Sequence, residues 1–101
     1  MDKKAKILDI AMNLNRVGNW AADDYNAKQK RISLFLNQTT KYINSLDVLD
    51  FTEPFKKTFH KFSKEYSELE KANIKTSDDA LLWAEKMMTW GNILTHRAKL
   101  I

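Results

Sequence analysis

The segment that decides the fold class is Pro54–Ala72, PFKKTFHKFSKEYSELEKA. Its large apolar side chains recur at alternating intervals of four and three residues, which places them on one stripe of an α-helix. These side chains are Phe55, Phe59, Phe62, Tyr66 and Leu69. Thr52 precedes Glu53 and Pro54, which is typical of an N-cap followed by a first helical turn. We therefore predict an amphipathic helix over residues 54–72.

A second helix is predicted to begin after an N-cap at Thr76 or Ser77 and to end near Lys99. Two aspartates follow the N-cap, where they favour the positive end of the helix dipole. Its predicted core stripe consists of Ala80, Ala84, Met87, Met88, Gly91, Leu94 and Ala98. A glycine inside a helix costs about 1 kcal/mol relative to alanine. We therefore expect Gly91 to permit the close approach of a neighbouring helix.

Residues 3–46 carry two apolar helical stripes that stay in phase across Gly18 and Asn19. One interpretation is a single helix of about 44 residues, roughly 66 Å long at 1.5 Å per residue. The other is a break, in which Gly18 ends one helix and Asn19 caps the next. A compact domain of this length has a radius of gyration of about 13 Å, so a single long helix would need a second copy to cover it. We favour the break at Gly18–Asn19.

The predicted fold is therefore an all-α, up-and-down bundle of four helices. The alternative is a three-helix protomer with one very long N-terminal helix that dimerises. The chain of 101 residues is expected to form a single domain over residues 1–101. With only two glycines and one proline, it lacks the turns of an all-β domain and the glycine-rich loops that cradle phosphates.

The composition contains no cysteine, which excludes disulfides and thiolate metal sites. No apolar run is long enough to cross a membrane, and Asp9 and Asn13 interrupt the N-terminus too early for a signal peptide. We therefore expect a cytoplasmic protein. Neither His60 nor His96 follows a carboxylate three or four residues earlier, as the Glu-x-x-His pairs of di-iron bundles do. We predict a protein that is not an enzyme and holds no metal or cofactor.

The polar side of the 54–72 helix is a candidate anion or nucleic-acid face. It presents Lys57, His60, Lys61 and Lys64, in a chain whose net charge is +4. Glutamates four residues after Lys61 and after Lys64 offer ion pairs that would partly neutralise this face. The face also lacks the interleaved aromatic residues on which single-stranded bases stack. A solvated surface and a binding groove are both open interpretations.

The segment around His60 resembles the histidine phosphotransfer domains of bacterial relays. Phe62 matches the apolar residue that typically stands two positions after their histidine. Ser63 and Lys64 stand where those domains have lysine and glycine, and the missing glycine leaves less space for a partner's aspartyl phosphate. A solvated histidine on a charged helix face is the alternative, and it is the interpretation that we favour.

The last helix carries apolar residues on a second face, away from its core stripe. This candidate protein interface consists of Leu82, Lys86, Trp90, Ile93 and Leu100. A helix that is apolar on two faces needs a second partner, and tryptophan is enriched at interface hot spots. We therefore predict a homodimer, or a helical hetero-partner on the same face. Scattered surface aliphatics are the alternative, and Trp90 fits either a core or an interface position.

Three runs of the chain look similar to a family of small all-helical cyanobacterial proteins: LNRVGNWAADD at 14–24, WAE at 83–85 and TWGNILTHRAKL at 89–100. The resemblance implies a bacterial, cytosolic source and carries no activity. Taken together, the residues favour a non-enzymatic helical protein–protein interaction or regulatory module, by analogy at the level of the fold. The alternative is electrostatic nucleic-acid binding through the basic face of the third helix.

Overall fold

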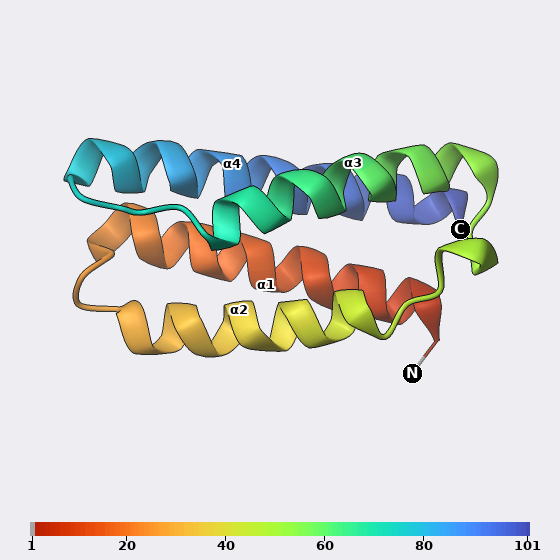
Figure 1. The fold of residues 1–101 in the computed structure, drawn as a ribbon, viewed down its shortest axis with the longest axis horizontal. Coiled ribbons are helices and arrows are strands. Elements are labelled where there is room, and N and C mark those ends of the chain that lie inside the picture. Colours follow the sequence, from red (N-terminus) through yellow and green to blue (C-terminus); the bar gives the residue numbers. More distant parts are fainter. Residues whose placement is uncertain (1) are drawn as a thin grey trace.

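The computed structural model describes residues 2–101 and confirms an all-α bundle of four helices. The helices are α1 (Lys3–Asp24), α2 (Gln29–Asn44), α3 (Glu53–Glu70) and α4 (Ser77–Arg97). Short 3₁₀ segments follow α2 at Val48–Asp50 and α4 at Ala98–Leu100. Successive helices run up and down along the long axis, so each is antiparallel to the next (Figure 1). The molecule measures 39 × 21 × 20 Å, with a radius of gyration of 13.3 Å.

The predicted break at Gly18–Asn19 is wrong, because α1 continues through both residues to Asp24. The single helix over residues 3–46 is also wrong, because the chain reverses over residues 25–28. Gly18 lies inside α1 and faces α4. A Cβ atom at Gly18 would lie 2.4 Å from Cγ of Met88 and 3.0 Å from the carbonyl oxygen of Ala84. The glycine is therefore a close-packing position rather than a helix end.

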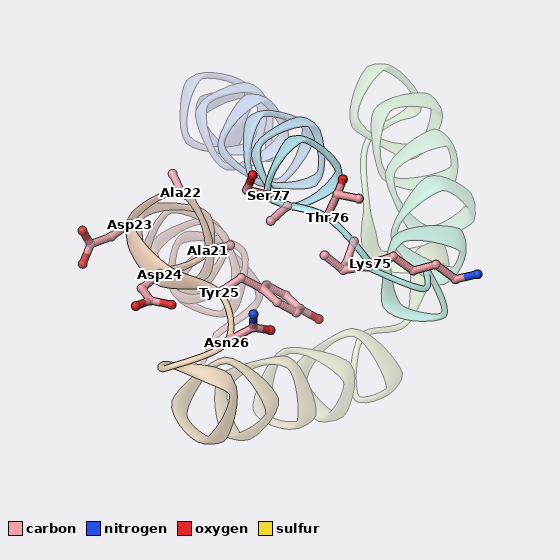
Figure 2. A pocket seen from close by; sticks show the side chains of 11 residues that line it. Ala21, Ala22, Asp23, Asp24, Tyr25, Asn26, Lys75, Thr76 and Ser77 are labelled. Carbon is pink, nitrogen blue, oxygen red and sulfur yellow. The ribbon is translucent and has the colours of Figure 1, made fainter.

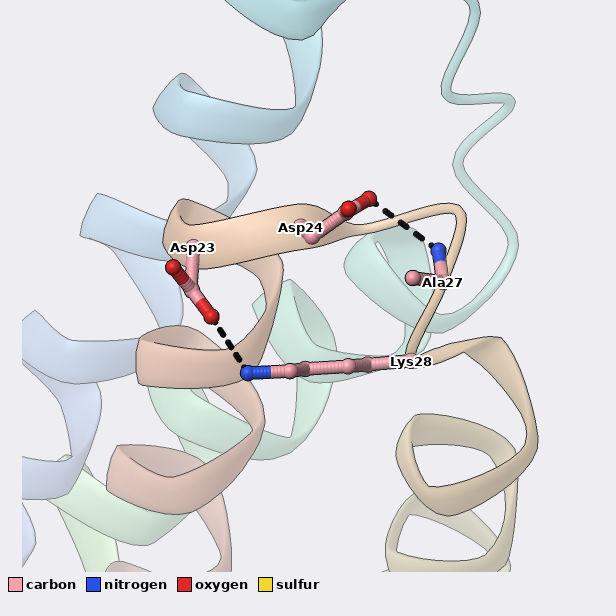
Figure 3. Close-up of polar contacts among 4 residues, drawn as sticks. All are labelled: Asp23, Asp24, Ala27 and Lys28. Carbon is pink, nitrogen blue, oxygen red and sulfur yellow. Dashed lines mark hydrogen bonds and ion pairs between the residues drawn. The ribbon is translucent and has the colours of Figure 1, made fainter.

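The turn between α1 and α2 needs no glycine (Figure 3). A carboxylate oxygen of Asp24 accepts a hydrogen bond from the backbone N–H of Ala27 at 3.1 Å. The ammonium group of Lys28 donates to the carboxylate of Asp23, and this bond lowers the pKa of Asp23. Aspartate and asparagine side chains compete with the helix for backbone donors and thereby favour turns. In residues 2–101 no φ is positive, so this reversal uses ordinary backbone conformations.

Helices α1 and α4 are the most closely packed pair in the bundle. A Cβ atom at Gly91 would lie 2.8 Å from Oδ1 of Asn15, which confirms that Gly91 permits a close helix approach. Ala11 and Ala84 are fully buried on the same two helices. Small side chains at these positions let the two backbones approach until main-chain and side-chain atoms of the opposite helix touch.

Helix α3 brings an aromatic layer to the other side of the core. All five residues of its predicted apolar stripe are buried. The ring of Phe62 packs against the ring of Trp90 with centroids 5.5 Å apart. The indole N–H of Trp83 donates to the carbonyl of Leu69 at 2.8 Å. On the other flank, the Tyr66 hydroxyl donates to the carbonyl of Leu36 in α2 at 3.0 Å. The polar groups of Trp83 and Tyr66 thus find partners inside the core.

The predicted starts of the last two helices are confirmed. Thr76 is the N-cap of α4, and its hydroxyl accepts from the backbone N–H of Asp79 at 3.0 Å in a reciprocal capping box. Thr52 is the N-cap position of α3. Its hydroxyl donates to the carbonyl of Leu100 at 2.9 Å and makes no bond to its own helix. Thr52 therefore ties the start of α3 to the C-terminal segment.

Candidate interaction groove between helices α3 and α4

The structure brings two separately predicted surfaces together. The connection between α3 and α4 is only six residues long, 71–76, so the two helices are antiparallel neighbours (Figure 1). Three adjoining hollows follow the seam between them, and we call these together the α3–α4 groove. The central hollow has a volume of about 490 Å³. Its lining consists of Lys61, Lys64, Glu65, Glu68, Leu69, Ala72 and Lys86.

The hollow at the C-terminal end of α4, which we call the Arg97 end, has a volume of about 250 Å³. Three cationic side chains line it: Lys57 and Lys61 from α3 and Arg97 from α4. Trp90 and Ile93 supply its apolar surface, and no carboxylate lines it. This end of the groove therefore combines three positive charges with an apolar patch.

The third hollow, which we call the Leu82 end, has a volume of about 210 Å³. Leu69, Ala72 and Lys86 line both this hollow and the central one, and Lys61 is shared by the central hollow and the Arg97 end. The groove is therefore continuous along the two helices. Leu82 lines this end and is 60% exposed, which makes it the most exposed apolar side chain of the groove.

Four of the five predicted interface residues line the groove: Leu82, Lys86, Trp90 and Ile93. Leu100 does not line it, and its carbonyl is bonded to Thr52. Of the two positions left open for Trp90, the structure favours the core. Only 6% of Trp90 is exposed, because its ring fills the space between α3 and α4 against Phe62. Trp90 therefore belongs to the core, and only an edge of its ring lines the groove.

The predicted basic face divides in the same way. Lys57, Lys61 and Lys64 line the groove, whereas His60 is exposed and does not line it. The expected ion pairs from Lys61 and Lys64 to glutamates four residues later do not form. In residues 2–101 the ion pairs are Lys28–Asp23 and Lys56–Glu53, both outside the groove. The cations of the groove are therefore free to meet charges on another molecule.

Sequence reasoning missed the contribution of Arg97 and of the apolar floor at Leu69 and Ala72. The signal that would have found them is the short connection over 71–76, which forces α3 and α4 to lie side by side. With the helices antiparallel, the basic side of one must border the second apolar face of the other.

A smaller cleft of about 190 Å³ lies at the end of the bundle where α1 ends and α4 begins (Figure 2). Its two carboxylates are already engaged within the chain. Asp23 pairs with Lys28, and Asp24 accepts from the backbone of Ala27. The N-terminus of α4 is closed by its own capping box. The carboxylates and the helix N-terminus of this cleft are therefore not free for a ligand.

Within residues 2–101, no group of three or more His, Cys, Asp or Glu side chains is placed to hold a metal ion. None of the helices described is both long enough and apolar enough to span a bilayer. Burial raises the pKa of the Tyr66 hydroxyl to about 12, and the charge of Glu70 adds to this, while a hydrogen bond with Thr40 opposes it. Since this hydroxyl is committed to Leu36 and Thr40, it serves the core.

In comparisons with known proteins, no protein-family model matches this chain, and no curated protein or solved structure matches it significantly. The resemblance to small cyanobacterial proteins, with the bacterial and cytosolic source that it implies, stays a prediction.

Proposed function

We propose that this protein is a non-enzymatic, helical protein–protein interaction module that binds a partner in the α3–α4 groove. The observation that carries this proposal is the coincidence of the two predicted surfaces. Lys57, Lys61 and Lys64 from α3 border the same groove as Leu82, Lys86 and Ile93 from α4. A groove with an apolar floor and charged rims is the surface into which amphipathic helices dock.

The charge of the groove favours a different protein over a second copy of this chain. A two-fold symmetric dimer places the same patch of both subunits in contact. A two-fold axis along the groove would bring the cations near Arg97 against those of the other copy. An axis across the groove would set them against the Leu82 end, where the carboxylate of Asp79 already accepts hydrogen bonds from the backbone of Lys75 and Thr76. Like charges in contact are unfavourable by up to several kcal/mol. The predicted homodimer through α4 therefore gives way, in this proposal, to a hetero-partner on the same face.

The proposal is tested by partner capture from a nuclease-treated extract of the native organism. The bait proteins are the wild type, Lys57→Glu/Arg97→Glu in the groove, and Lys30→Glu/Lys41→Glu as a matched control. Lys30 and Lys41 are exposed on the outer side of α2, and the control changes the net charge by the same amount. We expect a protein partner that the wild type and the control retain and that the groove variant loses. Equal capture by all three baits would contradict the proposal.

Nucleic-acid binding is the second candidate function, and the Arg97 end supports it. Three cations without a carboxylate form a site for a phosphate backbone. Glu65 and Glu68 in the central hollow oppose it, as does the burial of Trp90, which leaves no exposed ring for base stacking. Gel-shift assays with DNA and RNA at low and physiological salt decide the matter. No shift at low salt would eliminate this candidate, because counterion release makes such binding strongest there.

A further inference from the structure

We infer that the occupant of the α3–α4 groove is a single amphipathic helix with an apolar seam and acidic flanks. This inference rests on the proposed function and names the chemistry of the partner. The groove extends along α4 from Leu82 to Arg97, which at 1.5 Å per residue is about 22 Å. A helix of about four turns fills that length.

The apolar floor sets the spacing of the partner's seam. Leu82, with Leu69 beside it, lines one end of the groove, and Ile93, with an edge of Trp90, lines the other. Leu82 and Ile93 are eleven residues apart on α4, about 16 Å along its axis. Eleven residues make about three helical turns, so two anchors at i and i+11 on a partner helix point to the same side. Apolar residues at i+4 and i+7 complete a continuous seam between them.

The rims of the groove set the charge of the partner's flanks. Lys57, Lys61 and Lys64 stand on the α3 rim, and Lys86 and Arg97 stand on the α4 rim. The groove also has three carboxylates, those of Glu65 and Glu68 in the central hollow and that of Asp79 at the Leu82 end, so the positive charge is least compensated at the Arg97 end. Cations stand on both rims there, so both flanks of the partner helix need carboxylates at that end. The acidic residues of the partner are therefore concentrated at the end that lies beside Arg97.

Two other occupants fit the groove less well. A nucleic-acid strand would place phosphates beside Glu65 and Glu68 and would leave the apolar floor without a partner. A second copy would have to present an acidic, apolar helix face. The helix face of this chain that comes nearest is on α4, where Leu81, 47% exposed, lies between the exposed Asp78 and Glu85. That face offers one exposed leucine rather than an apolar seam of three turns, so the length of the groove favours a different, acidic helix.

The test uses synthetic helical peptides of about 16 residues and the full-length protein. The first peptide has leucines at i, i+4, i+7 and i+11 and glutamates on both flanks. The second has the same composition with the leucines scattered around the helix, and the third has lysines in place of glutamates. Binding is measured by fluorescence anisotropy at physiological salt, and backbone amide shifts in ¹⁵N spectra locate the site. The protein variants are the groove pair Lys57→Glu/Arg97→Glu and the control pair Lys30→Glu/Lys41→Glu.

We expect the first peptide to bind at least about tenfold more tightly than either of the others. A tenfold difference in affinity corresponds to about 1.4 kcal/mol. The groove pair should weaken it by about tenfold or more, and the control pair by less than about twofold. The largest amide shifts should fall near Lys61 and Ile93. Equal binding of the scattered peptide would overturn the apolar seam, and equal binding of the lysine peptide would overturn the acidic flanks. Circular dichroism melts of both variant pairs establish that they are folded.

Three further outcomes separate the inference from the proposed function. Light scattering that shows a wild-type dimer, lost in the groove pair, would make a second copy the occupant and overturn the inference. Tighter binding of a 20-nucleotide single-stranded RNA than of the first peptide would overturn it in favour of nucleic acid. If a groove-dependent protein is captured from extract and the first peptide does not displace it, the acidic helix is wrong and the interaction module stands. If the peptide binds and no groove-dependent protein is captured, the interaction module fails and the inference falls with it.

Discussion

The two sides of α4 pack in opposite ways. On the side toward α1, neither Gly18 of α1 nor Gly91 of α4 has room for a Cβ atom. The backbone of each helix is therefore in direct contact with side chains of the other. Toward α3, the rings of Phe62 and Trp90 stand between the helices with centroids 5.5 Å apart. The distance between helix axes depends on the side chains at the contact. Small residues close one seam, and aromatic residues hold the other open, so the groove lies beside α3.

The comparison also explains why a surface groove coexists with a well-filled core. Aromatic side chains bury about 150–250 Å² each, so a few of them stabilise an interface without close backbone contact. Trp83 and Tyr66 add hydrogen bonds to backbone carbonyls of α3 and α2. Lysine, arginine and exposed leucine side chains lie outside this aromatic layer and line the groove. The groove is therefore a direct result of the way α3 is held.

The largest expected loss of stability comes from disrupting the aromatic contact between α3 and α4. Trp90→Ala should lower the free energy of unfolding by about 3–5 kcal/mol, because a large buried ring is lost and a cavity remains between α3 and α4. Guanidinium unfolding followed by circular dichroism measures the change. The matched control is Leu82→Ala on the same helix, where the side chain is 60% exposed and the effect should stay within about 0.5 kcal/mol. A loss below about 1 kcal/mol for Trp90→Ala would mean that the ring does not hold the seam.

The buried hydroxyl group of Tyr66 predicts a loss of stability at high pH. The pKa of Tyr66 is about 12 in the folded protein against an ordinary value of 10, so the folded state keeps a proton that the unfolded state releases between these values. Its contribution is complete below pH 10 and is lost as the pH rises toward 12, a decrease of about 3 kcal/mol. Urea unfolding of the wild type and of Tyr66→Phe measures this decrease. All other groups of the chain are the same in both proteins, so the difference between them isolates Tyr66.

At pH 8 Tyr66→Phe should be less stable than the wild type by about 1–2 kcal/mol, because the carbonyl of Leu36 loses its donor. Above pH 10 the two stability curves should converge and then cross, because the decrease of about 3 kcal/mol exceeds this difference. Parallel curves up to pH 11.5 would show that this hydroxyl is not protected by the packing of α3 on α2.

The small-residue seam predicts a moderate effect at Gly18. Gly18→Ala removes a helix-interior glycine, which by itself favours stability by about 1 kcal/mol. The new methyl group would collide with Met88 and with the carbonyl oxygen of Ala84, and overpacking costs about 1–3 kcal/mol. We expect a net loss of up to about 2 kcal/mol in thermal or denaturant unfolding. A second measurement in a Met88→Ala background should reduce this loss, and a stabilised Gly18→Ala protein would contradict the close packing of α1 on α4.

The smallest expected effect is at Gly91. The three atoms nearest to a methyl group there all belong to the side chain of Asn15, which is half-buried and can turn aside. Gly91→Ala alone should therefore change the free energy of unfolding by less than about 1 kcal/mol. In an Asn15→Ala background the same change should be stabilising by up to about 1 kcal/mol, because only the gain in helix propensity remains. A large loss of stability in both backgrounds would show that the backbone, rather than the side chain of Asn15, restricts the space at Gly91.

The amino-acid sequence alone determined the parts of this fold that depend on local patterns. The four-and-three spacing from Phe55 to Leu69 requires a helix, and the caps at Thr52 and Thr76 place the starts of α3 and α4. It did not locate the first turn. A glycine such as Gly18 is typical of a helix end, yet here it allows close contact with Met88, seventy residues later in the chain. A local pattern cannot distinguish the two roles, because the difference lies in a distant helix.

Only the tertiary structure decided what the surfaces are. Trp90 fits a core or an interface equally well by its spacing, and the packing of Phe62 against it places it in the core. Lys61 and Lys86 belong to different helices and were assigned to different candidate sites, and the antiparallel pairing of α3 and α4 puts them on one groove. Helical periodicity specifies which residues share a face of one helix. Which faces border one another is set by how bulky side chains hold the helices apart.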